Sequence, residues 1–202
     1  MEQIAILKAK LNRFKGQRDL LIEQRKASEK LQETYAKTLD VALQARIVVQ
    51  TVAESTQKQI EWHISNLVTS ALAAVFPDPY TCTLKFVQRR NQTEADLIFT
   101  KDGNETDDLL STAGGGAVDI ASFALRVALW SIKKTRSVII LDEPFRFLSV
   151  NLQAKASEMI KEISEKLGIQ IIMVSHLPEI IKAADRVINV TNVNGESQIA
   201  IL

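Results

Sequence analysis

The stretch SVIILDEPF, residues 137–145, ends an unbroken apolar run with two acidic side chains. The run is typical of a buried strand, and Pro144 marks its end. Asp142 and Glu143 follow the run directly, yet burying an unpaired charge costs several kcal/mol. We therefore expect both carboxylates to face a ligand at the end of the strand, not the core.

A second apolar stretch, IQIIMVSH at residues 169–176, also ends in polar side chains, here Ser175 and His176. The residues between the two stretches, 151–168, have apolar side chains at helical spacing and finish with Gly168, which suits a helix C-terminus. Strand, helix and strand in this order predict a parallel sheet covered on both faces. Ligands of such sheets bind beyond the carboxyl ends of the strands, which is where these polar residues fall.

The polar residues at the two strand ends suit phosphate chemistry. Asp142 can hold Mg²⁺ through water, and Glu143 can orient and deprotonate an attacking water. His176 can hydrogen-bond a terminal phosphate. Each residue also has a structural alternative, because a strand-end acidic pair is commonly a loop or helix cap and a strand-end histidine is usually on the surface.

Three consecutive glycines, Gly114, Gly115 and Gly116, lie in STAGGGAVDI at residues 111–120 and open a mostly apolar helical segment. Unhindered backbone N–H groups at a helix N-terminus suit phosphate oxygens. A glycine triplet taken alone more often means a flexible turn. Arg126 lies inside the apolar helix, where we expect a buried ion pair or, alternatively, a coupling between ligand and helix.

The first 68 residues contain no proline and one glycine, and their apolar side chains alternate steps of three and four with a shift near Ser28. This pattern predicts a long amphipathic helix of roughly 90–100 Å that needs a partner helix. The alternative is a lone helix folded back on its own domain. His63 is assigned to helix packing. We place an arm at residues 1–68 and a globular lobe at 69–202.

The rest of the lobe shows turn and strand signals. Prolines at positions 77 and 79 end the long helix, and residues 81–88 and 95–100 alternate as antiparallel strands followed by a turn at 102–104. Residues 177–185 predict a short helix. The flanks of Asn194-Gly195 predict a hairpin.

Composition excludes several classes of protein. The 25 basic and 24 acidic residues nearly cancel, so the whole molecule does not attract nucleic acid. One cysteine and two histidines exclude an internal disulfide framework and a histidine-rich metal site, and favour a reducing, cytoplasmic setting. The N-terminus is not a signal peptide, and we expect no apolar stretch of the ~18 residues that a membrane span needs.

The order of these features resembles the C-terminal lobe of an ABC-type ATPase head of the SMC-like branch, which includes the SbcC and RecN DNA-repair proteins. SVIILDEPF looks like a Walker B motif, residues 145–151 hold the D-loop position with Ser149, and MVSH looks like the H-loop. GGGAVDIASFALRVALW looks like the signature motif, in the form with three glycines found in bacterial and phage ATPases. The resemblance implies an α/β fold, with a parallel sheet flanked by helices, a C-terminal hairpin and a preceding long coiled-coil helix.

The resemblance also implies roles for the residues named above. Asp142 would hold Mg²⁺, Glu143 would be the catalytic base, and His176 would be the switch histidine. Gly114, Gly115, Gly116, Ser111 and Ser149 would contact ATP across a dimer of heads. Hydrolysis would drive rearrangement of the coiled coils and DNA in repair or recombination, with partners that include a second head, DNA and a nuclease subunit, and no membrane.

Three departures from the family pattern matter. Gly114 stands where the signature serine is usual, so Ser111, Thr112 or backbone N–H groups would have to compensate. Ser149 stands where the D-loop aspartate is usual. No GxxxxGK[ST] motif occurs, so an N-terminal lobe bearing Walker A must come from another chain or from a missing segment. The isolated chain is therefore expected to be inactive.

Two other functions stay open at this point. The first is a non-catalytic coiled-coil interaction or regulatory protein built on a relic ATPase lobe, which the residues at positions 114 and 149 favour. The second is a DNA-binding module without nucleotide, which rests only on the basic stretches Lys85–Arg90 and Lys133–Arg136.

Overall fold

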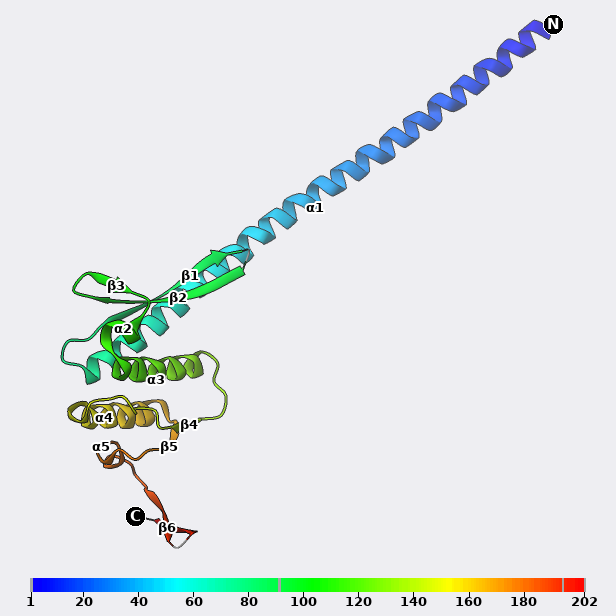
Figure 1. The fold of residues 1–202 in the computed structure, drawn as a ribbon. Coiled ribbons are helices and arrows are strands. Elements are labelled where there is room, and N and C mark those ends of the chain that lie inside the picture. Colours follow the sequence, from blue (N-terminus) through cyan, green and yellow to red (C-terminus); the bar gives the residue numbers. More distant parts are fainter. Residues whose placement is uncertain (1, 91, 194, 202) are drawn as a thin grey trace. The chain divides into compact units, whose positions relative to one another are not determined.

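The structure is a computed structural model that describes residues 2–90, 92–193 and 195–201, arranged as two compact units that divide between Ser55 and Thr56 (Figure 1). Its elements, in chain order, are α1 (Glu2–Val75), β1 (Thr81–Arg89), β2 (Gln92–Lys101), β3 (Asn104–Thr106), α2 (Leu109–Ala113), α3 (Gly115–Ile132), β4 (Val138–Asp142), α4 (Val150–Leu167), β5 (Gln170–Val174), α5 (Pro178–Ile181), β6 (Ile188–Val193) and β7 (Glu196–Ile201). These elements make up the α/β fold, the long N-terminal helix and the C-terminal hairpin that the sequence predicted.

The first unit consists of the N-terminal part of α1. The helix is continuous through Ser28, and the described residues of this unit, Glu2 to Ser55, correspond to a length of about 80 Å. All described side chains from Gln3 to Ser55 are exposed, including the apolar stripe; Leu7 and Tyr35, for example, are 71% and 65% exposed. An exposed apolar stripe is what a coiled-coil arm offers to a partner helix. The boundary proposed at residue 68 remains a prediction.

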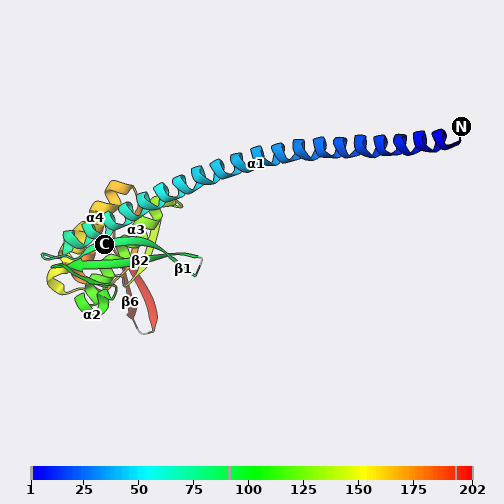
Figure 2. The same ribbon diagram turned by 90° about the horizontal axis from the view of Figure 1, so that it is seen from above.

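In the second unit, the C-terminal part of α1 covers one edge of the antiparallel sheet β1-β2-β3 (Figures 1 and 2). Three α1 side chains at four-residue spacing accept hydrogen bonds from alternate backbone amides of β1. The pairs are Phe86 N to Glu61 Oε1 at 2.7 Å, Leu84 N to Ser65 Oγ at 2.8 Å, and Cys82 N to Thr69 Oγ1 at 2.8 Å. The spacings match because four helical residues rise about 6 Å and two strand residues about 6.8 Å. The helix thus satisfies amides that an open strand edge would leave unpaired.

Strands β4 and β5 form the predicted parallel pair, but the residues that the structure describes cover only one of its faces. Leu141 is 2% exposed and lies in the core together with residues of α3 and α4. On the other face Ile140, Ile172 and Val174 are 72%, 47% and 59% exposed. The expectation of a sheet covered on both faces therefore holds for one face only, because the described residues form no layer over the other.

The structure of helix α3 shows that two predictions, on the length of apolar stretches and on Arg126, were wrong. By length and composition it could cross a membrane, so the expectation that no apolar stretch reaches that length was wrong. Its apolar residues are explained by the core, since seven of them are buried there, among them Phe123 and Val127. Arg126 is exposed and has no ion pair among the described residues, so the expected buried ion pair was also wrong.

Histidine 63 packs between helices, as predicted, and also makes a hydrogen bond that the sequence did not reveal. It is half-buried on α1, and its Nε2 lies 2.6 Å from Ser131 Oγ on α3. Ser131 donates its own proton to Ala128 O, so His63 is the donor of this bond.

The C-terminal hairpin forms around Gly195 as predicted, and Asn194 lies outside the described residues. All described residues of β6 and β7 are exposed. One face of the hairpin is apolar, with Ile188 opposite Ile201 and Val190 opposite Ile199. Helix α5 is shorter than the predicted 177–185, and the short helix α2 was not predicted.

Candidate functional site

The carboxyl ends of β4 and β5 bring the predicted strand-end residues together. Asp142 pairs in register with Val174, and the Glu143 amide donates to Val174 O at 2.9 Å, which extends the pairing by one residue. His176 follows two residues after β5, and its Nδ1 lies 2.8 and 2.9 Å from the two carboxylate oxygens of Glu143. Three of the predicted site residues therefore lie at one edge of the sheet.

Glu143 has a backbone conformation that side chains rarely adopt. Its φ is +45°, in the left-handed region, where a residue other than glycine costs about 1–2 kcal/mol. Such strain is characteristic of functional sites, where the surrounding structure enforces it. The side chain is 33% exposed, so a ligand at the edge can reach it.

The contact between Glu143 and His176 restricts the tautomer of the imidazole. An ionised carboxylate only accepts hydrogen bonds, so the Nδ1 atom of His176 must carry a proton. The His176 side chain is 69% exposed, which leaves Nε2 open to solvent or to a ligand. A neutral His176 in this contact has no proton on Nε2, and can donate to a phosphate there only when the ring is protonated or the contact breaks.

Asp142 is exposed, and within the described part of the chain its carboxylate has no hydrogen bond or ion pair. No group of three or more His, Cys, Asp or Glu side chains in that part could enclose a metal ion. A site whose protein ligand is the Asp142 carboxylate fits Mg²⁺, because this ion keeps several waters and is commonly held by one or two carboxylates together with substrate phosphates. It does not fit a metal that needs an all-protein cage.

The three glycines differ in their surroundings. Gly114 is the N-cap of α3, is exposed, and has a φ of +82°. A side chain at Gly114 would meet nothing within 4 Å, whereas Cβ atoms at Gly115 and Gly116 would press on Phe147 and Leu148 of the loop after β4. Gly115 and Gly116 therefore permit a close contact within the chain, whereas the space beside Gly114 is open.

The hydroxyls that could replace the missing signature serine are engaged locally. Ser111 Oγ donates to the Asp108 carboxylate, and Thr112 Oγ1 donates to Asp108 O at 2.8 Å. The hydrogen bonds from Ser111 hold the pKa of the Asp108 carboxyl below its usual range. Both hydroxyls thus donate to Asp108, the N-cap residue of α2, in this conformation.

Ser149 is the N-cap of α4, and its side chain is exposed and makes no capping hydrogen bond. Its hydroxyl is therefore available to a ligand or to a second subunit. One further residue near the loop at residues 145–149, Asp119, was not predicted from the sequence. Its carboxylate accepts a hydrogen bond from the Phe147 amide at 2.9 Å. A polar residue within an apolar helix, four residues after Gly115, was the available signal.

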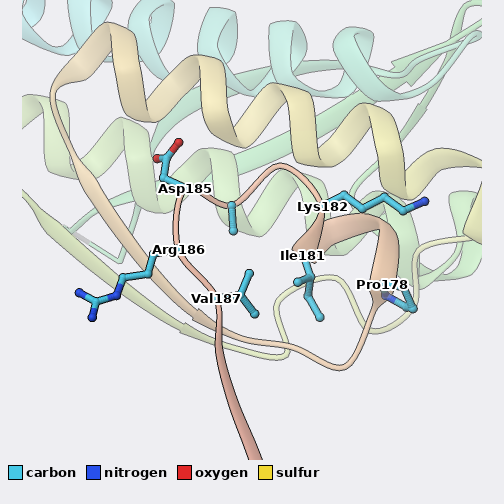
Figure 3. Close-up of a pocket in the computed structure, with 7 residues that line it drawn as sticks. Pro178, Ile181, Lys182, Asp185, Arg186 and Val187 are labelled. Atoms are coloured by element: carbon cyan, nitrogen blue, oxygen red, sulfur yellow. The ribbon is translucent and has the colours of Figure 1, made fainter. Parts of the chain in front are cut away.

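A surface pocket of about 510 Å³ lies elsewhere, along residues 178–187 (Figure 3). Its lining consists of Pro178, Ile181, Lys182, Ala184, Asp185, Arg186 and Val187. None of these is a predicted site residue. The ammonium group of Lys182 forms an ion pair with the carboxylate of Glu179, three residues earlier in the chain. The predicted site residues lie at the strand ends and not in this pocket.

Comparison with known proteins gives partial matches. No family model matches the chain. It is 30% identical over 130 residues to a DNA double-strand break repair Rad50 ATPase of Thermoplasma volcanium, which is 59% of this chain and 14% of that protein. It is 41% identical over 64 residues to the glucose import ATP-binding protein GlcV of Saccharolobus solfataricus, which is 31% of this chain and 18% of GlcV. The chain thus spans less than a fifth of these curated relatives.

Solved structures match over more of the chain. The Smc head domain with an extended coiled coil from Pyrococcus furiosus, bound to the C-terminal domain of ScpA, has a TM-score of 0.58 and 19% identity over 91% of this chain and 48% of that one. A structure from work on ATP-driven dimerization and DNA-stimulated activation of SMC ATPases has a TM-score of 0.58 and 18% identity, covering 74% and 88%. Part of this chain is similar in sequence to Rad50 ATPases. Its fold is that of an SMC-type head with a coiled coil.

Proposed function

We propose that this chain is the C-terminal lobe of an SMC-like ATPase head in the branch that includes SbcC and RecN, and that it hydrolyses ATP once an N-terminal lobe with a Walker A motif completes it. One observation supports this proposal above others: Asp142, Glu143 and His176 gather at the end of a parallel sheet whose outer face is apolar and exposed. The three residues at the strand ends supply the groups that ATP hydrolysis needs. The exposed apolar face of β4 and β5, called the bare face below and formed by Ile140, Ile172 and Val174, offers a surface for a second lobe.

The bare face supports the missing lobe through its composition. Strands of a parallel sheet are apolar on both sides because a layer covers each face. Burying one aliphatic side chain contributes about 1.5–3 kcal/mol, so Ile140, Ile172 and Val174 together favour association strongly. The apolar face of the hairpin β6-β7 adds to this argument, because a two-stranded hairpin is marginally stable by itself.

In the completed head, each residue at the strand ends has a separate task. Asp142 would hold Mg²⁺ through water, and the metal would neutralise phosphate charge when bound. Glu143 would orient a water and take its proton, a role that needs a free carboxylate oxygen. His176 now occupies that carboxylate, so we propose that this contact loosens when nucleotide is bound and that the His176 Nε2 atom then donates to the terminal phosphate.

The composite site requires two heads, each of which presents Gly114–Gly116 and Ser149 to the nucleotide of the other. We propose that closing and opening of the heads moves the arms formed by α1 in a cytoplasmic DNA repair or recombination machine. The relatives' names support this assignment, since one is a DNA double-strand break repair ATPase and one structure concerns ATP-driven dimerization. DNA and a nuclease subunit are the proposed partners.

One structural feature supports the alternative function, a non-catalytic coiled-coil interaction protein. Ser111 and Thr112 are both occupied by the α2 cap, so no hydroxyl replaces the absent signature serine in this conformation. A relic lobe that serves as a coiled-coil interaction protein would show this feature.

Equilibrium binding of Mg·ATP separates the two functions. The chain is mixed with a separately produced Walker A lobe of an SMC-like head, and binding is measured for wild type and for Glu143→Gln. The proposed ATPase binds ATP in both cases and turns it over only in the wild type. Absence of ATP binding by a stably assembled head would favour the interaction protein.

A further inference from the structure

The loop at residues 145–149 is fixed along one face of α3. This loop joins Glu143 to α4, and the residues of α3 that contact it are spaced four apart, which puts them on one face of the helix. Gly115 lies against Phe147, the Asp119 carboxylate accepts the Phe147 amide, and the ring of Phe123 meets the ring of Phe145 edge-on with centroids 5.7 Å apart. Phe145 and Leu148 are buried, so the loop has little freedom to move separately from α3.

The glycines of α3 are required by this contact. A Cβ atom at Gly115 would lie 2.7 Å from Phe147 Cβ, and one at Gly116 would lie 3.1 Å from Phe147 O and 3.3 Å from Leu148 Cα. Backbone and Cβ atoms cannot turn aside as the end of a long side chain can. The start of α3 and the loop are therefore in direct backbone contact.

Asp119 is the polar link in this contact. Its Oδ2 accepts the Phe147 amide at 2.9 Å, and no other hydrogen bond to its carboxylate occurs among the described residues. Burial raises the pKa of the Asp119 carboxyl, and the bond from Phe147 opposes that effect. A half-buried carboxylate is a costly way to hold one amide, which suggests a role beyond stability.

We propose that Asp119 is a positioning residue that couples the glycine loop of a head to Glu143 of the same head; this inference rests on the function proposed above. In that function, the glycine loop contacts the nucleotide of the second head while Glu143 acts on the nucleotide of its own. A displacement of α3 at one site therefore moves the loop beside Glu143 at the other. Ser149 replaces the usual aspartate of this loop, and the link through Asp119 supplies a path between the two sites within one chain.

The first test needs no nucleotide. Hydrogen exchange of the Phe147 amide is measured in the chain by NMR for wild type, Asp119→Ala and Asp119→Asn. Loss of the acceptor should speed exchange about tenfold or more in the alanine variant, whereas asparagine keeps an acceptor oxygen and should stay close to wild type. Ser122→Ala, an exposed position on α3, is the control and should leave exchange unchanged.

The second test uses the head completed with a Walker A lobe. Asp119→Ala should lower kcat about tenfold while the Kd for ATP stays within about twofold, because positioning and not binding is lost. Asp119→Asn should restore kcat. A merely structural role would lower the melting temperature and leave the kcat of the folded fraction unchanged.

Several results would overturn the proposal. They are unchanged exchange in Asp119→Ala, an unchanged kcat in that variant, or an asparagine variant as slow as the alanine variant. Glu143→Gln separates this failure from failure of the proposed function. If Glu143→Gln abolishes hydrolysis and Asp119→Ala does not alter it, only the coupling is wrong; if Glu143→Gln hydrolyses ATP normally, both are wrong.

Discussion

Replacing Ile140 with threonine tests whether the bare face of β4-β5 is a binding surface for a second lobe. Threonine keeps the β-branched shape that favours a strand, so the substitution changes polarity more than strand propensity. Ile140 is 72% exposed in this chain. Its change to threonine should therefore alter the free energy of unfolding of the isolated chain by less than about 0.5 kcal/mol.

The same substitution should matter once the face is covered. Burial of an isoleucine side chain contributes about 1.5–3 kcal/mol, and most of the Ile140 surface is still available to be buried. Loss of that contribution corresponds to an affinity for the Walker A lobe that is about ten- to a hundredfold weaker. A hydroxyl buried without a partner would add to the loss.

Two measurements decide the matter: urea denaturation of the isolated chain and calorimetric titration with the Walker A lobe. Leu141→Ala is the control on the opposite face, where the side chain is 2% exposed, and should destabilise the isolated chain by about 2–5 kcal/mol. The face is not a binding surface for the lobe if Ile140→Thr leaves the affinity unchanged, and Ile140 is already packed within the chain if the substitution destabilises the isolated chain by much more than about 0.5 kcal/mol.

Further predictions follow from the site and the fold. Glu143→Gln in the completed head should keep ATP bound and lower turnover by at least about a hundredfold, measured by phosphate release; undiminished turnover would exclude Glu143 as the base. Ser65→Ala leaves a β1 amide unpaired and should cost about 1–3 kcal/mol in urea denaturation, whereas Ser70→Ala, exposed on the same helix, should cost far less; equal costs would deny the bond a role. The pKa of Asp108 is lowered by hydrogen bonds from Ser111, so its stabilising effect is present at neutral pH and is lost as the pH falls through the lowered pKa. An acid titration followed by circular dichroism should show that loss in wild type and not in Asp108→Asn.

Much of the fold could be predicted because its signals are local. The apolar run before Asp142, the left-handed C-cap at Gly168 and the turn at Gly195 are properties of a few adjacent residues. Each has a defined physical cause, namely burial, glycine's tolerance of positive φ, and hairpin turn geometry.

Features that depend on distant residues could not be predicted. Glu143 adopts its left-handed conformation because β5 binds its amide and His176 contacts its carboxylate, and no neighbour in sequence indicates this. Arg126 was misjudged because α3 is apolar on more than one side, and only the packed structure shows which side is buried. The contact of Asp119 with Phe147 joins residues 28 apart.

The predicted sheet covered on both faces shows a different kind of limit. The sequence pattern predicts that β4 and β5 are covered on both faces, whereas in the structure one face is covered and Ile140 on the other is exposed. It does not report whether the layers come from the same chain.

Steady-state ATP hydrolysis by the purified chain, with and without an added Walker A lobe, shows whether this chain supplies half of an ATPase site. We expect turnover no faster than buffer for the chain alone and Mg²⁺-dependent turnover when the lobe is present. Sustained hydrolysis by the chain alone would contradict this expectation, because residues 1–202 would then contain a complete site.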